Sequence, residues 1–278
     1  MCPNLPPDQN MPQKNDAHQA RGRLLLIPNT LDLGCVGDGE ALPDLQQVLP
    51  LGAIQAASQL RYWVAENAKT TRAFIKRVGE VVPLALPLQE QDIQVLPKPQ
   101  KGAAAKPGAE ADKAIAALLA PARAGHDLGL ISEAGLPGVA DPGSALVLAA
   151  HRAGITVLPL SGPSSLVLAL AASGLHGQSF AFVGYIPVDA TQRAQRIREL
   201  EQTSRKLHQT QLVIETPYRN TALWEALCQH LQAGTLLSVS CGLTLAQGWS
   251  RTDTVARWRQ HGLTLPDNVP AVFSWLAA

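Results

Sequence analysis

The sequence predicts an α/β fold in two domains, with a mostly parallel sheet in the N-terminal domain and a mixed sheet in the C-terminal domain. Three observations lead to this prediction. Short apolar runs alternate with helical stretches from residue 23 onward, which is typical of βαβ units. Of the 278 residues, 46% are hydrophobic, enough to bury one large or two small cores. The alternation is interrupted at residues 174–179, so we place the domain boundary near Leu175.

The first domain is expected over residues 23–175, after a disordered tail at 1–22 that is rich in Pro, Asn and Gln. Apolar runs bounded by turn residues predict its strands, and 3.6-residue periodicity predicts its helices. A segment rich in proline, alanine and lysine, 97–108, is expected to be a flexible loop. The expected strands are LLLI after Arg23, 62–65, 127–132 and 155–160. The expected helices are 43–59, a helix capped by Thr70 or Thr71 and closed by Gly79, 110–120, 144–152 and 164–172.

The second domain is expected over residues 176–278. It begins a new series of apolar runs, which are separated by a basic helical stretch at 189–208 and a helix at 218–231. The late runs are expected to close this second sheet, which is expected to be mixed. Its expected strands are FAFVGYIP, LVIETP, LLSVSCGLTL, TDTVARW and PAVFSWLA.

Charge and composition exclude several classes of protein. Lys and Arg number 23 against 22 Asp and Glu, a formal net charge of +1, so any contact with nucleic acid must be a local patch. No apolar run approaches the roughly 20 residues needed to cross a bilayer, and no secretion signal opens the chain. We expect a cytoplasmic protein without a membrane partner. The four cysteines and seven histidines lack metal-ligand spacing, so we expect no metal.

Two loops dense in small residues follow neighbouring strands. They are SEAGLPGVADPG (132–143) and SGPSS (161–165). Loops at the carboxyl ends of parallel strands meet helix N-termini and present unpaired N–H groups. The glycines let the backbone approach a ligand closely, and the prolines hold the loops in shape. These loops predict a site for an anionic or zwitterionic ligand, although short connections of this kind also occur without a ligand.

The order and spacing of these loops resemble the tetrapyrrole methylase superfamily, and within it the ribosomal RNA small subunit methyltransferase I family. The likeness is most extended over residues 128–175, where that superfamily has a Ser-Asp-Ala-Gly-Thr-Pro loop, then Asp-Pro-Gly, then Pro-Gly-Pro. It implies a tetrapyrrole-methylase-like fold, S-adenosylmethionine bound between the domains, and a homodimer. The cofactor-binding residues that it implies are Ser132, Ala134, Gly135, Pro137, Gly138, Asp141, Pro142, Gly143, Ser161, Gly162, Pro163, Ser164, Glu215 and Thr216.

Weaker likenesses lie on either side of this segment. WVAENAKTTRAFIK resembles an Ala-Glu-Asp-Thr-Arg segment of the family, with Glu66 kept, and VIETPYRNTALWEAL resembles its Tyr-Glu-Ser-Thr-His-Arg helix start. Methyl transfer to a hydroxyl needs one group to accept a proton. Glu66 and Glu133 are the candidate catalytic residues because both follow predicted strands, and Glu215 is a third. A carboxylate stabilised by a helix N-terminus is the alternative role for each.

Three hypotheses about function remain open. The first is a methyltransferase acting on an RNA ribose 2′-hydroxyl. The second is an S-adenosylmethionine-binding module without catalysis that contacts RNA or protein. It is favoured by Cys241, Gly242 and Leu245, which stand where the ribosomal family has Arg, Glu and Lys. The third is methylation of a tetrapyrrole or another small molecule. The loop IPNTLDLG lacks the Gly-x-Gly-Pro-Gly of porphyrin methylases, which makes a tetrapyrrole the less expected acceptor.

RNA contact has its own candidate surface in the basic stretch at 189–208. Five cations lie on it, and a solvated helix face would explain the same pattern. Lysines of the loop at 97–108 could join the same patch. The cations are Arg193, Arg196, Arg198, Arg205 and Lys206, and the loop lysines are Lys98, Lys101 and Lys106.

Overall fold

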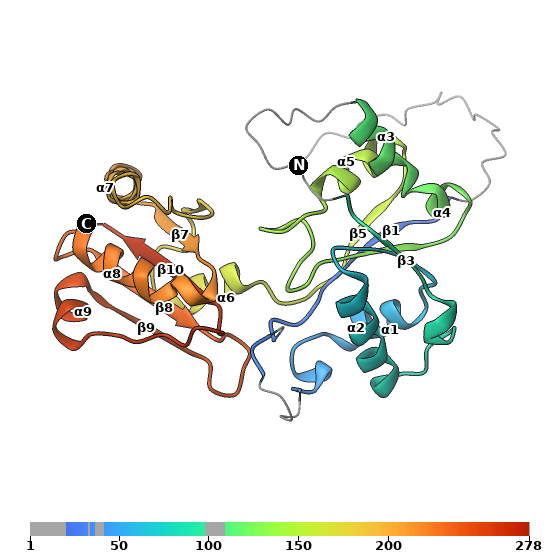
Figure 1. The fold of residues 1–278 in the computed structure, drawn as a ribbon, viewed down its shortest axis with the longest axis horizontal. Helices are drawn as coiled ribbons and strands as arrows, with labels where there is room; N and C mark the ends of the chain where they lie inside the picture. Colours follow the sequence, from blue (N-terminus) through green and yellow to red (C-terminus); the bar gives the residue numbers. More distant parts are fainter. Residues whose placement is uncertain (1–20, 33, 37–41, 98–108, 278) are drawn as a thin grey trace, which may run out of the picture.

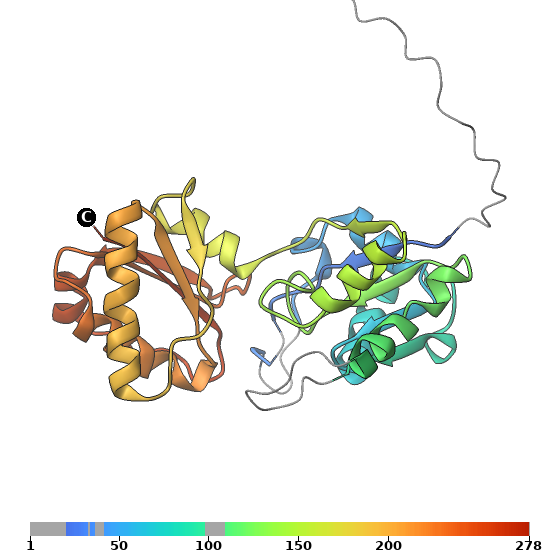
Figure 2. The same cartoon turned by 90° about the horizontal axis from the view of Figure 1, so that it is seen from above.

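The computed structural model describes residues 21–32, 34–36, 42–97 and 109–277. It has two lobes side by side, each built on one sheet, joined by the segment between strand β5 and helix α6 (Figures 1 and 2). The expected α/β class is confirmed, with a parallel sheet first and a mixed sheet second. Residues 1–20 of the expected tail and 98–108 of the expected loop, with Lys98, Lys101 and Lys106, lie outside the described residues.

The N-terminal sheet has, within the described residues, five parallel strands in the order β3-β2-β4-β1-β5. Strand β4 is buried along its whole length, as expected of a central strand covered on both faces. The strands are β1 (Leu24–Ile27), β2 (Tyr62–Ala65), β3 (Asp92–Val95), β4 (Leu128–Ile131) and β5 (Val157–Pro159).

Helices cover both faces of this sheet. One core joins Ile54 and Phe74 to Trp63 of the sheet, and the other joins Leu119 and Leu146 to residues such as Leu130. The first face carries α1 (Leu51–Ser58) and α2 (Ala68–Val81), with the short helices η1 (Leu45–Gln47) and η2 (Leu88–Glu90). The second carries α3 (Ala109–Ala117), α4 (Ala120–Arg123) and α5 (Ser144–Arg152).

The C-terminal sheet is ordered β6-β7-β10-β8-β9. Only β6 and β7 pair in parallel among its described strands, and the other pairings are antiparallel. Its strands are β6 (Phe180–Phe182), β7 (Thr210–Ile214), β8 (Leu236–Cys241), β9 (Trp249–Thr254) and β10 (Ala271–Leu276). Its helices are α6 (Ser165–Ser173), α7 (Ala190–Leu207), η3 (Pro217–Arg219), α8 (Asn220–His230) and α9 (Val255–His261).

Helix α6 packs on the second sheet, although it precedes the boundary expected near Leu175. Leu166 and Leu170 share a core with Leu212 of β7 and Val272 of β10. The other face of the sheet is covered by α7, α8 and α9, with Ile197, Trp224 and Trp258 in its core. We propose that the packing boundary between the domains lies between β5 and α6.

Proline explains why the helix expected at 43–59 is wrong. It is instead the short helix η1 followed by α1, and Pro50 occupies the N-cap of α1. Proline lacks an N–H and disfavours the helical conformation of the residue before it, so one continuous helix cannot pass through Leu49 and Pro50.

Two further boundaries differ from expectation because a different polar residue caps the helix. Asn67, and not Thr70 or Thr71, accepts from the backbone N of Lys69 at 2.9 Å, and α2 then runs through Gly79 to Val81. Thr254 caps α9, so TDTVARW is a strand only as far as this residue. The helices expected at 110–120 and 218–231 are each divided into two shorter helices.

Strand β3 was not expected from the sequence. Its residues are mostly exposed at the sheet edge, so it lacks the apolar run that marks the other strands.

Two glycine substitutions test this packing in opposite directions. A Cβ at Gly129 of β4 would lie 2.7 Å from Leu60 Cδ1 and 3.0 Å from Trp63 Cε3. We expect Gly129→Ala to lower the free energy of unfolding by about 1–3 kcal/mol through overpacking. A Cβ at Gly52 of α1 meets no atom within 4 Å. We therefore expect Gly52→Ala to raise the free energy of unfolding by about 0.5–1 kcal/mol. Urea unfolding measures both, and equal effects would contradict the packing described for β4.

Candidate active site

Three loops meet at the carboxyl edge of the N-terminal sheet, because β1 lies between β4 and β5. Asn29, just after β1, holds the loop after β4 in place. Its backbone N–H donates to the Gly135 carbonyl at 2.8 Å. Its side-chain amide donates to the carbonyls of Ser132 at 3.0 Å and Glu133 at 3.1 Å. The loop at 132–143 is therefore fixed to the loop after β1.

The glycines expected to contact a ligand mainly allow these loops to pack together. Gly135 has a φ of +62°, and a Cβ there would lie 3.4 Å from both Leu31 Cδ2 and the Pro163 carbonyl oxygen. A Cβ at Gly162 would lie 2.1 Å from Pro28 Cβ, so only glycine fits there. The close approach predicted at Gly162 is therefore to the protein's own proline.

The remaining predicted loop residues take different places. Gly143 caps α5 at a φ of +133°, and Gly138 has a φ of +81°. Pro137 and Pro163 are buried, Pro142 is half-buried, and Ser161 is exposed. Ser164 is the N-cap of α6 but makes no side-chain capping bond. The Ser132 hydroxyl is buried and has no hydrogen-bond partner within the described part of the chain.

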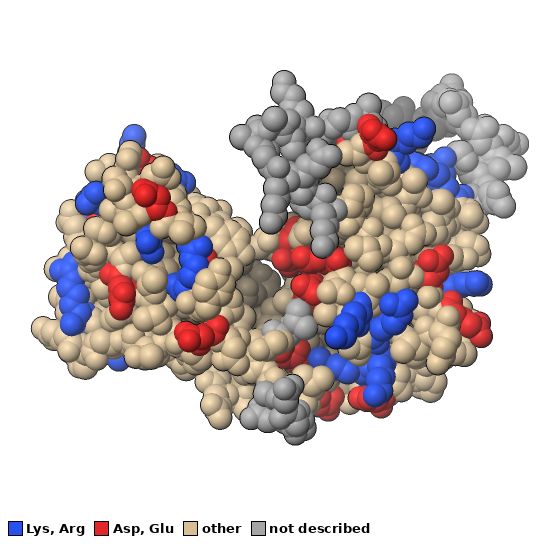
Figure 3. All heavy atoms as spheres, viewed as in Figure 1, with Lys and Arg blue, Asp and Glu red and all other residues tan. Residues whose placement is uncertain are grey.

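Three carboxyl groups lie together at this edge. The Glu66 side chain accepts a 3.3 Å hydrogen bond from the backbone N–H of Glu133, and the Glu133 side chain accepts one at 3.4 Å from Thr70 Oγ1. Burial, followed by the charges of Glu66 and Glu133, raises the pKa of Asp141 to about 6. The pKa of Glu66 is raised by burial and by Glu133, against the effect of the Glu133 N–H bond. In Figure 3, acidic side chains gather on the right-hand lobe beside the other lobe.

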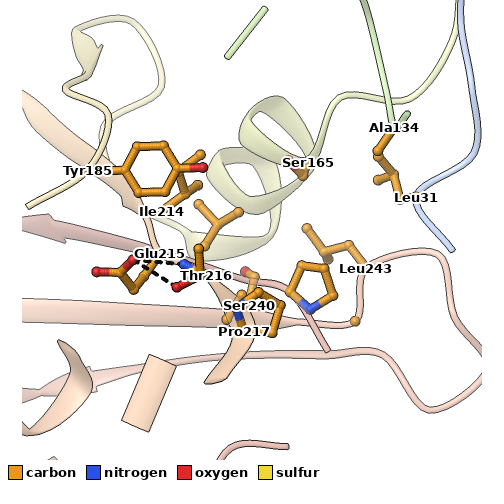
Figure 4. Close-up of a pocket in the computed structure, with 14 residues that line it drawn as sticks. Leu31, Ala134, Ser165, Tyr185, Ile214, Glu215, Thr216, Pro217, Ser240 and Leu243 are labelled. Carbon is orange, nitrogen blue, oxygen red and sulfur yellow. Dashed lines mark hydrogen bonds between the residues drawn. The ribbon is translucent and has the colours of Figure 1, made fainter. Parts of the chain in front are cut away.

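A pocket of about 260 Å³ lies between the lobes beside these loops. Residues from both lobes line it, and most of them are apolar, which suits an aromatic or aliphatic ligand group. The lining residues are Leu31, Ala134, Ser165, Tyr185, Ile214, Glu215, Thr216, Pro217, Ser240, Gly242, Leu243, Pro270, Ala271 and Val272. Figure 4 shows Leu31 and Ala134 on the side of the pocket opposite Tyr185.

Of the residues predicted to bind the cofactor, Ala134, Glu215 and Thr216 line this pocket. Glu215 is firmly held: its carboxylate accepts from the Thr216 N–H at 2.8 Å and pairs with Arg219 at 2.8 Å. Most of the C-terminal wall was missed, because Ser240, Leu243 and Val272 look like ordinary strand-end residues in the sequence. The turn GYIP after β6 is the one signal that could have drawn attention to Tyr185.

The loop with the departures from the ribosomal family forms part of the pocket wall. Gly242 lines the pocket at a φ of +62°, and a Cβ there would lie 3.1 Å from Val269 Cγ1. Gly248 folds back onto it, since a Cβ at Gly248 would lie 2.1 Å from the Gly242 carbonyl oxygen. Cys241 is buried. A glutamate at position 242, as in the ribosomal family, would need a left-handed backbone and would press on Val269.

The described residues give two negative findings, one for metal ions and one for membrane helices. No group of three or more histidine, cysteine or carboxylate side chains there could hold a metal ion. None of the helices described is long and apolar enough to cross a bilayer.

Comparison with known proteins identifies the family. The family pattern described as Tetrapyrrole (Corrin/Porphyrin) Methylases matches residues 53–248. The chain belongs to the tetrapyrrole methylase family. Its members are S-adenosylmethionine-dependent methyltransferases, so the cofactor and the enzyme class predicted from the sequence are confirmed for this methylase at the level of the family.

The curated relatives of this methylase match only part of its length. Ribosomal RNA small subunit methyltransferase I of Mesorhizobium japonicum is 35% identical over 144 residues, 52% of this chain and 48% of that protein. The enzyme of the same name from Halalkalibacterium halodurans is 40% identical over 95 residues, 34% of this chain and 32% of that protein. The matches thus span about a third to a half of the relatives' length.

A solved structure shares the fold of this methylase. Uroporphyrin-III C-methyl transferase from Thermus thermophilus, complexed with S-adenyl homocysteine, aligns with a TM-score of 0.51 and 16% identity. The alignment covers 91% of this chain and 97% of that chain. The similarity extends over both lobes and supports the two-sheet architecture.

The residues present between the lobes fit S-adenosylmethionine. The apolar walls suit an adenine ring, and the buried Ser132 hydroxyl lacks a partner among the described residues. The carboxylates of Glu66, Glu133 and Asp141 suit a ligand that carries a positively charged sulfur and an ammonium group.

Asp141 makes stability depend on pH. Its folded pKa, about 6, exceeds the ordinary value of 3.8, so the native state binds more protons than the unfolded state between these two values. Its contribution to the free energy of unfolding therefore falls as pH rises from about 4 to about 6. We expect the free energy of unfolding of Asp141→Asn, compared with that of the unaltered chain, to increase as pH rises through that window. Above the window the difference should stay constant. Urea unfolding at a series of pH values measures this.

Asp92→Asn provides the control, because Asp92 is exposed on edge strand β3. The same pH series on this variant gives the effect of removing a carboxylate that lies outside the cluster. If the difference for Asp141→Asn follows the same course as that for Asp92→Asn, the three carboxyl groups do not interact in the folded protein.

Proposed function

We propose that this methylase transfers the methyl group of S-adenosylmethionine to the 2′-hydroxyl of an RNA ribose. The observation that carries the proposal is the apolar pocket between the lobes, with a cluster of three carboxyl groups beside it. The names of the curated relatives support an RNA acceptor, although those relatives match over half of their length or less.

The cofactor would be held by both lobes. Its adenosine would lie against apolar residues such as Leu31, Leu243 and Val272. Its amino-acid end would meet the loop at 132–143, with the Ser132 hydroxyl as a hydrogen-bonding group. The bound cofactor supplies a methyl group on a positively charged sulfur, and Glu66, Glu133 and Asp141 stabilise that charge.

Asp141 is our candidate for the proton acceptor. With a pKa of about 6 it is ionised at neutral pH, yet it is basic enough to take a proton efficiently. The acceptor hydroxyl would give its proton to this carboxylate as its oxygen bonds to the methyl carbon, while the bond from that carbon to sulfur breaks and S-adenosylhomocysteine leaves. Glu66 and Glu133, the candidates named from the sequence, would act mainly by keeping the site negative, because each already accepts a hydrogen bond.

A second hollow, where Arg193 could contact a phosphate, lies outside the pocket on α7 and α8. Arg193, Ala222 and His230 line a hollow of about 210 Å³ there, together with Glu225. Burial lowers the pKa of His230, as do the charges of Arg198 and Arg193. Of the arginines expected to contact RNA, Arg193 lines this hollow and Arg198 acts on the charge of His230, while Arg196 pairs with Glu199 at 3.6 Å.

A small-molecule acceptor is the second candidate, because the pocket lining contains no lysine or arginine among the described residues. The carboxylate cluster disfavours a tetrapyrrole, which carries several carboxylates of its own. The remaining hypothesis, a binding module without catalysis, would leave the raised pKa of Asp141 without a role. The homodimer expected from the family stays a prediction.

The acceptor class can be tested directly. We expect calorimetry to show binding of S-adenosylmethionine, and radiolabelled methyl groups to enter total RNA and not a small-molecule extract. Label in the extract alone would favour the small-molecule candidate. Binding with label in neither pool would favour the module without catalysis, and absence of binding would contradict all three.

Asp141→Asn tests the proton acceptor. We expect kcat for RNA methylation to fall about 10²–10⁴-fold, with S-adenosylmethionine affinity much less affected. In the unaltered enzyme, kcat/KM should rise with pH through about 6 as Asp141 loses its proton. Asp92→Asn is the matched control and should keep both kcat and the profile. An unchanged rate in Asp141→Asn would move the role to Glu66 or Glu133, which the corresponding glutamine variants test.

A further inference from the structure

Two of the three tyrosines are exposed on neighbouring loops of the C-terminal lobe. Tyr185 is 59% exposed and Tyr218 is 69% exposed. Tyr185 follows β6, and Tyr218 lies in η3 after β7; the two strands are parallel neighbours. Their carboxyl ends are joined by a 3.2 Å hydrogen bond from the Ile214 N–H to the Gly184 carbonyl. We call Tyr185 and Tyr218 the aromatic lip.

The aromatic lip borders the interlobe pocket. Tyr185 lines it, and Tyr218 follows Pro217, which also lines it. In Figure 4 the Tyr185 hydroxyl points toward the side that carries Leu31 and Ala134. The pKa of Tyr185 is raised by burial and by the charges of Asp141, Glu215 and Glu66, which agrees with a ring that faces carboxylates of both lobes.

Four of the five tryptophans are buried, whereas Phe180 at the far end of β6 is 45% exposed. Trp63, Trp258 and Trp275 are each at most 1% exposed, and Trp224 is 8% exposed. Tyr185 is an exposed ring that lines a pocket, and Tyr218 lies one residue beyond Pro217 of the pocket wall. Exposed aromatic groups beside a pocket commonly contact a ligand. Local contacts hold the backbone under Tyr218, because Arg219 pairs with the buried Glu215.

We propose that the aromatic lip stacks on the base of the acceptor nucleotide, so that the enzyme acts on an unpaired nucleotide of RNA. The inference rests on the proposed function and adds to it the structural state of the substrate. Tyrosine rings stack on unpaired bases of any sequence, whereas the face of a base in a duplex is covered by its neighbours. The carboxylate cluster repels phosphate but not a neutral base, so the base is the part of the nucleotide that suits this position.

The backbone phosphates then have a place on the outer side of the lip. Arg193 Nη2 donates to the Val188 carbonyl at 3.0 Å, so this arginine lies at the end of the loop that carries Tyr185. The hollow lined by Arg193 and His230 continues from there between α7 and α8. The base of a nucleotide would then lie on the aromatic lip, and its phosphate would lie toward Arg193 at this hollow.

The test uses a short fluorescent RNA of mixed sequence, single-stranded or annealed to its complement, with the full-length protein. We expect the single strand to bind more tightly than the duplex. Tyr185→Ala and Tyr218→Ala should each weaken its binding about five-fold or more. Tyr185→Phe and Tyr218→Phe keep the ring and should stay within about two-fold. Phe180→Ala is the matched control: Phe180 is an exposed aromatic residue at the opposite end of β6 and should have no effect.

Calorimetry with S-adenosylmethionine shows whether each variant is folded and keeps its cofactor pocket. Tyr218→Ala gives the cleaner result, since Tyr218 does not itself line that pocket. Equal binding of single strand and duplex, or unchanged binding in both alanine variants, would overturn the aromatic lip even if the enzyme methylates RNA. If the single strand binds through the tyrosines but no methyl group enters RNA, the proposed function is contradicted, whereas stacking on the aromatic lip is supported. Loss of binding in the phenylalanine variants would point to the hydroxyls and refute stacking.

Discussion

The site depends on one asparagine. The side-chain amide and the backbone of Asn29 hold the loop after β4 against the loop after β1, and the sheet order places the loop after β5 on the other side of β1. Because Gly135 and Gly162 lack side chains, all three loops fit into one layer. The carboxyl groups and the N-terminal wall of the pocket are built on this layer, so its rigidity determines where they lie.

The carboxylate cluster stores unfavourable energy at that edge. Burial and the charge of Glu133 raise the pKa of Glu66, and burial with the charges of Glu66 and Glu133 raises the pKa of Asp141. Such an arrangement weakens the fold but prepares the site for a cationic ligand and for taking up a proton. By contrast, Glu215 across the pocket is balanced by Arg219 and by the Thr216 N–H. The first lobe thus places carboxylates without a paired cation beside the pocket. The second lobe contributes a carboxylate, Glu215, that is paired with Arg219.

The sequence predicts the class of fold well because apolar runs and helical periodicity are local signals. It misses β3, whose exposed edge position removes the apolar pattern, and it joins two helices across Pro50. The glycine and proline loops of the first lobe were recognisable, but their glycines serve loop packing. The other wall could not be predicted, because only tertiary structure brings Leu243 and Val272 opposite Ala134. The closeness of Asp141 and Glu66 could not be predicted either, because these residues follow different strands, β4 and β2.

The passage of the chain from β5 to α6 has a mechanical consequence. Within the described residues the backbone crosses from the first sheet to the second at this one segment, and α6 is anchored in the core of the second lobe (Figure 2). On the other side, Gly162 is wedged against Pro28. Bending between the lobes is thereby confined to the few residues that follow Gly162. Since the pocket takes its walls from both lobes, any rotation about this short segment would change the width of the pocket.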